Sequence, residues 1–150
     1  MDDLAKNERI EGFRQLCRER GLALTPQRRA ILVAVLELDD HPSADRVHAA
    51  LARRRVRVSR ATVFRTLESF ARMGIIAKTC HPGSAVRYDR RTDRHHHLVC
   101  LSCDRVIDIS DARLDALPVP DTRPFGFVVS DFKVQLRGIC KECREQEDKT

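Results

Sequence analysis

Four of the six cysteines form two pairs, and two residues separate the members of each pair. The pairs are Cys100 with Cys103 and Cys140 with Cys143. This spacing lets both sulfurs of a pair bind one metal ion, and four thiolates favour a closed tetrahedral zinc site that contributes directly to folding. A thiol redox switch is the alternative, but no thioredoxin-like pattern surrounds either pair. The cysteines therefore predict one structural Zn²⁺ per chain.

Three consecutive histidines precede the first cysteine pair. On a strand, His95 and His97 point to one side and His96 to the other, so the first two form a ligand pair that needs further ligands. Residues of suitable type are available at His41, Asp89 and Asp108. A mixed nitrogen and oxygen set favours Fe²⁺ or Mn²⁺ over metals that prefer thiolates. A solvated basic tract is the alternative interpretation of the histidine run.

The excess positive charge lies in the first part of the chain. Residues 1–90 hold 18 basic and 11 acidic side chains, whereas residues 91–150 hold 10 basic and 11 acidic ones. Seven arginines and no acidic residue occur between Arg46 and Leu67. Such a field favours a polyanionic partner, because each neutralised phosphate releases condensed counterions. A merely solvated surface is the alternative.

Length and composition exclude several classes of protein. With 150 residues, 42% of them hydrophobic, the chain is large enough for one domain or two small ones and is not expected to be disordered. Its longest apolar run, which contains Ile31–Leu36, is far shorter than the roughly 20 residues that cross a bilayer, so no membrane protein is expected. The polar first residues do not form a secretory signal. We therefore expect a cytoplasmic protein with reduced cysteines.

The elements that position these residues begin with helices. Helices are expected at residues 8–20, from Pro26, from Ala44 and at residues 60–73. Thr25, Ser43 and Ser59 are the expected N-caps, and Gly21 and Gly74 the expected stops. Cys17 lies on a core face of the first helix, whereas the role of Cys80 stays open. Short strands at residues 75–79 and 85–89, joined by a turn at 81–84, complete a winged helix-turn-helix.

Helix 60–73 is the expected recognition helix, with its first turn in the major groove of DNA. Its apolar residues are expected to face inward and its polar residues outward; the inward set is Val63, Leu67, Phe70 and Ala71, and the outward set is Arg60, Phe64, Arg65 and Glu68. Arginines can reach phosphates or guanine edges, and a phenylalanine ring can contact a thymine methyl group. The expected DNA-binding residues are Ser59, Arg60, Thr62, Phe64 and Arg65. An ordinary amphipathic helix is the alternative.

The region after the histidines has the composition of a small sheet, with strands expected at residues 106–109 and 127–136. Zinc would join the C-terminal end of this region to the start of the sheet. The zinc ion is expected to stabilise this region, because a domain of about 60 residues is only marginally stable without such a cross-link.

Several segments in a fixed order resemble the ferric uptake regulator (Fur) family of bacterial metal-responsive repressors. They are Leu24–Leu32, His41–Asp45, Ser59–Leu67, His95–Cys103 and Gly138–Cys143. The resemblance implies an α+β fold with a winged-helix DNA-binding domain at residues 1–89, a hinge at 90–94, and an α/β dimerisation and metal-binding domain at 95–150. It also implies a homodimer that binds a palindromic operator in double-stranded DNA, and structural zinc at the four paired cysteines.

The resemblance further implies a regulatory Fe²⁺ or Mn²⁺ site at the joint between the domains. The family's ligand positions fall on His41, Asp89, His95, His97 and Asp108. An ion bound there would hold the two domains in the orientation that fits DNA. The ion would bind this conformation more tightly than the open one, and that difference in affinity would switch DNA binding on.

Aspartate at positions 89 and 108 is similar to the peroxide-responsive (PerR-like) branch, whereas iron-responsive members usually carry glutamate there. In that branch peroxide reacts at bound Fe²⁺ and oxidises a ligand histidine, by analogy His41 or His95. The accessory metal site of iron-responsive members requires histidine where Phe132 stands, and often where Arg94 stands, so we expect it to be missing. We favour a peroxide-responsive repressor; an iron-responsive repressor is the first alternative and a zinc-responsive one the second.

Three features depart from the family pattern. Phe64 replaces the usual tyrosine, and Ala23 replaces a basic residue that is often aimed at the minor groove. Prolines interrupt a segment that is usually helical, at positions Pro118, Pro120 and Pro124. Because proline inside a helix costs about 3 kcal/mol, we expect only one or two helical turns after Asp111.

A non-haem iron enzyme is the main alternative from another class, because two histidines and a carboxylate can form its metal site. The sequence lacks the regular strands of the barrels that carry such sites. A zinc deaminase is also unlike this chain, because no glutamate adjoins the histidines and neither cysteine pair follows a proline. We therefore expect a regulator with no enzymatic activity and no small-molecule substrate.

Overall fold

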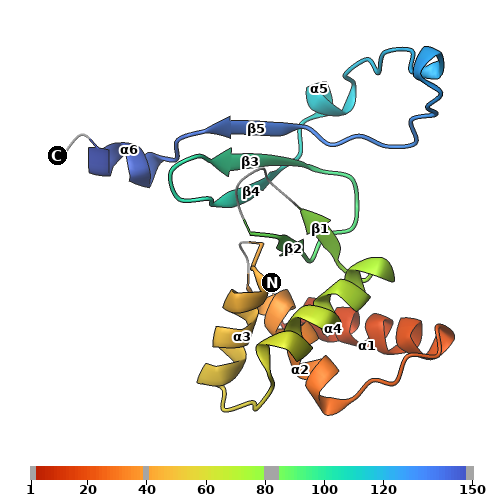
Figure 1. The fold of residues 1–150 in the computed structure, drawn as a ribbon, viewed down its shortest axis with the longest axis vertical. Coiled ribbons are helices and arrows are strands. Elements are labelled where there is room, and N and C mark those ends of the chain that lie inside the picture. Colours follow the sequence, from red (N-terminus) through yellow and green to blue (C-terminus); the bar gives the residue numbers. More distant parts are fainter. Residues whose placement is uncertain (1–2, 39–40, 80–84, 148–150) are drawn as a thin grey trace. The chain divides into compact units, whose positions relative to one another are not determined.

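The computed structural model describes residues 3–38, 41–79 and 85–147, and the chain divides into two compact units, Met1–Thr92 and Asp93–Thr150 (Figure 1). The division falls inside the segment 90–94 that the sequence suggests as a hinge. The two units combine helices with short strands, which confirms the α+β class. Among the described residues, no helix is long and apolar enough to cross a membrane.

The first unit is built on helices whose starts are fixed by side-chain caps. They are α1 (Asp3–Glu19), α2 (Pro26–Glu37), α3 (Ala44–Arg53) and α4 (Arg60–Arg72). Thr25, Ser43 and Ser59 each accept a hydrogen bond from the backbone N–H three residues on, as predicted. Gly21 and Gly74 adopt positive φ after α1 and α4, the conformation that ends a helix.

The core of the first unit lies where these helices meet. The rings of Phe13 and Phe70 make an edge contact with centroids 5.0 Å apart. Cys17 is buried in the same core, which confirms a packing role for its side chain. Residues from α2, α3 and α4 fill the remaining volume; they include Ile31, Leu32, Val35, Val47, Leu51, Val63 and Leu67. Burial of this aliphatic surface is the main source of the unit's stability.

The wing consists of β1 (Ala77–Thr79) and β2 (Arg87–Asp89), which pair antiparallel and are shorter than predicted. The predicted turn 81–84 and Cys80 lie outside the described residues. Glu68 of α4 ties the wing to the helix: Lys78 Nζ lies 2.9 Å from one carboxylate oxygen, and Tyr88 Oη donates to the other at 2.8 Å. Glu68 is therefore partly buried instead of outward-facing, because these contacts turn it toward the wing.

The second unit contains a small sheet in the order β4-β3-β5. Its elements are β3 (His96–Cys100), β4 (Val106–Ile109), α5 (Ala112–Asp115), the 3-10 turn η1 (Arg123–Phe125), β5 (Gln135–Gly138) and α6 (Lys141–Glu147). β3 pairs antiparallel with β4 and parallel with β5. The single turn of α5, capped by Asp111, confirms the short helix predicted from the prolines.

The predicted strand at residues 127–136 is wrong over most of its length. Pairing with β3 begins only at Gln135, and residues 127–134 form no strand. Thr122 instead closes a compact turn, because its carbonyl accepts from Phe127 N–H and its hydroxyl donates to Phe127 O. Val128 is 92% exposed, so its β-branched side chain packs against no sheet surface among the described residues.

Candidate functional site

The two cysteine pairs meet at one end of the sheet of the second unit. Cys100 ends β3, and Cys140 and Cys143 flank the start of α6. Because β3 and β5 are parallel, both pairs follow the same edge of the sheet. The four sulfurs lie within 4.8 Å of one another, with Cys100 Sγ 3.9 Å from Cys143 Sγ and Cys103 Sγ 3.8 Å from Cys140 Sγ.

This geometry fits a tetrahedral zinc ion. Four sulfurs at about 2.3 Å from zinc are about 3.8 Å apart, whereas a disulfide holds them at about 2.05 Å. The backbone N–H groups of Cys140 and Cys103 point at Cys100 Sγ and lower the pKa of this thiol to about 6. The lowered pKa favours the thiolate form of Cys100, which is the form that binds metal. The predicted cysteines therefore converge on a site suited to zinc.

A second group of possible ligands lies on β3 and β4 of the same unit. His97 is paired with Asp108 across the two strands. The Nε2 atoms of His95 and His97 are 3.0 Å apart and lie 3.5 and 3.6 Å from Asp108 Oδ1. His95 Nδ1 lies 2.8 Å from the Asp93 carbonyl, and because a carbonyl only accepts, Nδ1 carries a proton and Nε2 is the ring nitrogen that can bind a metal. Two ligands about 2.1 Å from one ion at a right angle are about 3 Å apart, so this half-site suits a metal.

The remaining two predicted ligands lie together in the first unit. His41 Nε2 is 3.4 Å from Asp89 Oδ2, and both side chains are buried. Tyr88 N–H donates to the Pro42 carbonyl at 3.0 Å, which places the residue before Pro42 beside the end of β2. Arg91 N–H holds the other carboxylate oxygen of Asp89 at 2.7 Å. The structure thus forms one half-site in each unit.

The position expected to lack an accessory metal is filled by the chain's own cation. The guanidinium carbon of Arg94 lies 4.2 Å from the centroid of the Phe132 ring, and Arg94 Nη2 donates to the Asp115 carbonyl at 3.1 Å. His96 is buried, points away from the ligand pair, and accepts from Val134 N–H through Nδ1 at 3.0 Å. A guanidinium on an aromatic face is a stable arrangement in its own right.

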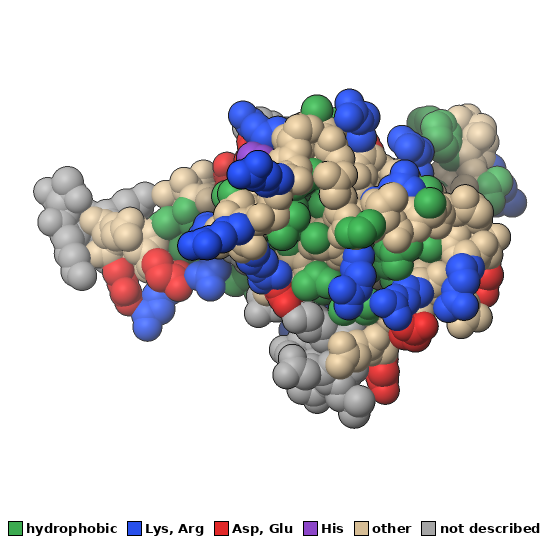
Figure 2. Space-filling model, turned by 90° about the horizontal axis from the view of Figure 1, so that it is seen from below, with side chains coloured by type: hydrophobic (Ala, Val, Ile, Leu, Met, Phe, Trp, Pro, Cys, Tyr) green, Lys and Arg blue, Asp and Glu red, His purple; other side chains and the backbone are tan. Residues whose placement is uncertain are grey.

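Helix α4 presents the predicted DNA-binding residues as follows. Ser59 and Thr62 form the cap, with their hydroxyls 2.9 Å apart, while Phe64 is 48% exposed and Arg65 is exposed. The inward residues Val63, Leu67 and Phe70 are buried as predicted. On the face of the molecule seen in Figure 2, basic side chains gather around apolar ones, the combination that suits a DNA backbone and base methyl groups.

Asp45 was not among the predicted site residues. Its Oδ1 accepts from Arg60 Nε at 2.9 Å and from Arg60 Nη2 at 2.5 Å. The two residues are 15 positions apart, and no periodicity relates them. They meet because the start of α3 lies beside the start of α4.

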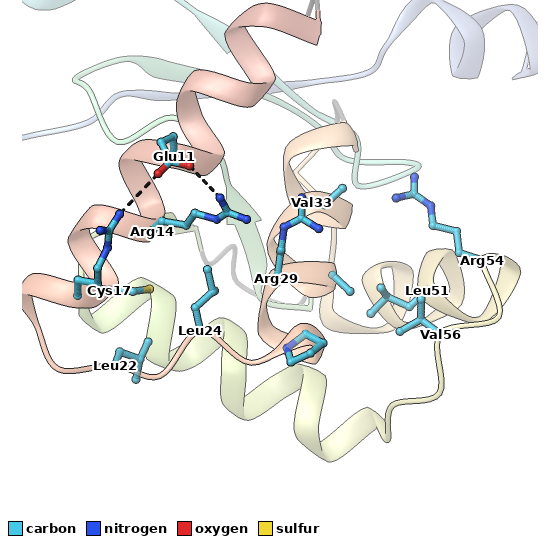
Figure 3. Close-up of a pocket in the computed structure, with 13 residues that line it drawn as sticks. Glu11, Arg14, Cys17, Leu22, Leu24, Arg29, Val33, Leu51, Arg54 and Val56 are labelled. Atoms are coloured by element: carbon cyan, nitrogen blue, oxygen red, sulfur yellow. Dashed lines mark hydrogen bonds and ion pairs between the residues drawn. The ribbon is translucent and has the colours of Figure 1, made fainter.

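A separate hollow of about 700 Å³ lies between α1, α2 and α3 (Figure 3). Its wall is apolar and includes Leu22, Leu24 and Val33. At its rim the Glu11 carboxylate lies 3.0 Å from Arg14 Nη1 and 3.5 Å from Arg18 Nη2. Arg29 and Arg54 also line the hollow, so the charge at its rim is positive. None of the predicted metal or DNA ligands lines it.

Comparisons with known proteins agree with these features. A sequence profile of the ferric uptake regulator family matches residues 19–137. The chain is 31% identical over 129 residues to the peroxide-responsive repressor PerR of Staphylococcus epidermidis, covering 86% of each chain. It is also similar to the ferric uptake regulator of Francisella tularensis solved with iron, with 28% identity, a TM-score of 0.71, and 83% of this chain and 96% of that chain covered. The fold matches that of the Helicobacter pylori ferric uptake regulator, with a TM-score of 0.73 at 19% identity over 93% of each chain.

A winged helix joined to a unit with clustered metal ligands defines a metal-responsive DNA-binding regulator. The chain belongs to the ferric uptake regulator family. Regulators of this family bind DNA and are dimers. Because the members of the family are transcriptional regulators and not enzymes, the same holds for this protein.

Proposed function

We propose that the protein is a repressor whose regulatory ion is held jointly by the two units. His41 and Asp89 would supply ligands from the first unit, and His95, His97 and Asp108 from the second. The observation that carries the proposal is the pair of Nε2 atoms 3.0 Å apart beside one carboxylate oxygen of Asp108. Imidazoles and carboxylates without thiolate suit Fe²⁺ or Mn²⁺.

Residues 1–89 would bind DNA, residues 95–150 would form the homodimer, and residues 90–94 would be the hinge. The five ligands can converge only in a restricted set of orientations of the two units. A bound ion supplies the free-energy difference that favours those orientations. The spacing of the two α4 helices would then match successive major grooves of a palindromic operator. A repressor that binds chromosomal DNA acts in the cytoplasm.

We propose two metal ions per chain, Zn²⁺ at the four paired cysteines and Fe²⁺ or Mn²⁺ at the regulatory site. The Arg94 guanidinium over Phe132 supports the absence of an accessory ion, because Arg94 already pairs with the nearby carboxylates of Asp115 and Asp131, at 3.5 and 4.0 Å. No small-molecule substrate is part of the proposal.

The test is selection of duplexes from a randomised DNA library in the presence of Mn²⁺, followed by affinity measurements with Mn²⁺ and with a chelator. A repressor of the proposed kind recovers palindromic sequences and binds them at least about tenfold more tightly with Mn²⁺. Equal binding with and without Mn²⁺, in protein that keeps its zinc, would contradict regulation by metal.

Peroxide is the signal that we propose, by similarity to PerR. Peroxide is expected to abolish DNA binding of the Fe²⁺ form while leaving the Mn²⁺ form active, because only Fe²⁺ transfers an electron readily to peroxide. The checks are affinity before and after treatment and the mass of the histidine peptides, where one added oxygen on His41 or His95 is expected. Equal loss from both forms would instead indicate thiol oxidation, and no loss from either would favour an iron-responsive repressor.

Arg65→Ala is expected to weaken binding to the selected duplex by about tenfold or more, because one arginine contact to a base contributes about 1–3 kcal/mol. Arg72→Ala is the matched control, since Arg72 is an exposed arginine in the last turn of the same helix. Affinity at fixed salt and zinc content are the measurements. If both variants lose the same small amount of affinity, the first turns of α4 do not contact the DNA.

A further inference from the structure

Arg60 is held by a single carboxylate in a defined orientation. Asp45 Oδ1 accepts from both Nε and Nη2 of Arg60, at 2.9 and 2.5 Å. These two nitrogens form one edge of the planar guanidinium. The other edge, formed by Nη1 and the second N–H of Nη2, has no partner among the described residues. That edge presents two parallel N–H donors, which can bind guanine O6 and N7 together.

The pair has little to offer the stability of the fold. The side chains of Arg60 and Asp45 are 70% and 66% exposed. Exposed ion pairs contribute little to folding. A free arginine side chain, however, loses rotamer entropy when it is fixed on a ligand. A carboxylate that fixes the guanidinium in advance lowers this cost when DNA binds.

A hollow of about 410 Å³ lies next to the pair, between the start of α3, the exposed face of α4 and β2. Ala44, Ala61, Phe64 and Val86 give it an apolar surface, and Asp45 and Arg60 also line it. In the major groove, thymine presents a methyl group and guanine presents two acceptors. An apolar surface beside a guanidinium therefore matches a guanine with a thymine at a neighbouring position.

We propose that Asp45 is a positioning residue that directs Arg60 at a guanine, with the adjacent hollow accepting a thymine methyl group. The inference rests on the proposed DNA-binding function and adds to it the residue pair that sets sequence preference at the start of α4. Asp45 itself contacts no DNA in this scheme, since its carboxylate would repel phosphate.

A double-mutant cycle tests the inference. The proteins are the zinc-loaded wild-type chain, Asp45→Ala, Arg60→Ala and the double variant, all with Mn²⁺. The probes are a duplex selected from the random library, the same duplex with each guanine replaced in turn by adenine, and an unrelated duplex. The discrimination ratio at each guanine is the affinity for the selected duplex divided by that for its adenine derivative.

Asp45→Ala is expected to lower the discrimination ratio at one guanine by about tenfold, within the range for a bidentate base contact. Its affinity for the unrelated duplex is expected to stay the same or rise, because an acidic side chain is lost. In the Arg60→Ala background, Asp45→Ala should leave the discrimination ratio unchanged. With Arg60 present, Asp45→Glu should keep the discrimination ratio of the wild type, because glutamate retains the carboxylate. Glu11→Ala is the control for charge alone, since Glu11 is an exposed acid on α1 of the same unit.

An unchanged ratio in Asp45→Ala, or an equal fall with and without Arg60, would overturn the positioning role. A rise in affinity for all duplexes by the same factor in Asp45→Ala and Glu11→Ala would reduce Asp45 to a surface charge. The proposed function is judged separately, on the Mn²⁺ dependence of the wild-type protein alone. A wild-type chain that selects no duplex overturns both proposals, whereas metal-dependent binding without a guanine effect overturns only this one.

Discussion

Cys143→Ser is expected to release the zinc and unfold residues 93–150. The second unit buries few hydrophobic side chains among its described residues: Val99, Val106 and the metal-site residues Cys100 and Cys143. Structural zinc contributes about 10–16 kcal/mol of apparent binding free energy to small domains, which exceeds what this core supplies. A serine hydroxyl is a poor replacement for a thiolate ligand, so the loss of one sulfur removes most of that free energy.

Zinc content and amide hydrogen exchange are the measurements for Cys143→Ser. Exchange protection should disappear from β3, β4 and β5 and persist in α2, α3 and α4, because the first unit has its own core. Cys17→Ala is the matched control: it removes a buried thiol from that core, so it should destabilise the first unit by about 1–2 kcal/mol and leave the zinc in place. A Cys143→Ser chain with one bound zinc and a protected sheet would show that the four sulfurs do not hold the ion.

The first unit was largely predictable because its signals are local. Thr25 followed by Pro26 encodes a helix start within two residues, and the same holds for the serine caps of α3 and α4. Each cap satisfies backbone N–H groups that neighbouring residues cannot, so the position of the cap determines the helix start. The cysteine pairs were equally local, since each pair already specifies two ligands of one ion.

Features that depend on tertiary contacts were not predictable. Residues 127–134 have strand composition, yet strand formation also requires a neighbouring strand, which the sequence pattern does not reveal. Glu68 was placed on the outer face of α4 because helical periodicity carries no information about Lys78 and Tyr88 of the wing. The contact of Asp45 with Arg60 was missed for the same reason.

Strand alternation explains why part of the metal site was predictable. His95 and His97 lie on one side of β3 and His96 on the other, as the two-residue period requires. The sequence predicts only that His96 points to the other side, and the structure shows that its buried ring accepts a hydrogen bond from Val134 N–H. This difference between adjacent histidines provides a matched pair of substitutions.

His95→Ala is expected to abolish the effect of Mn²⁺ and Fe²⁺ on DNA binding while leaving the zinc and the folded dimer intact. The substitution removes the Nε2 atom that lies 3.0 Å from His97 Nε2 and 3.5 Å from Asp108 Oδ1. Loss of a residue that merely orients a metal ligand costs about 10–100-fold in metal affinity, so loss of the ligand itself should cost at least about 100-fold. Isothermal titration with Mn²⁺ and duplex affinity across Mn²⁺ concentrations are the measurements.

His96→Asn separates the loss of a metal ligand from damage to β3. The asparagine side-chain oxygen can accept from Val134 N–H as His96 Nδ1 does, so the strand keeps this hydrogen bond. The variant loses the ring and, with it, the contact of His96 Nε2 with Asp115 Oδ1 at 3.3 Å. Its Mn²⁺ affinity and metal-dependent DNA binding should stay within about threefold of the wild type, since His96 faces away from the ligand pair. If both variants lose the metal response together, the histidines act through the stability of the sheet. If His95→Ala keeps a full response, the regulatory ion is bound elsewhere, and the joint site proposed for the two units is wrong.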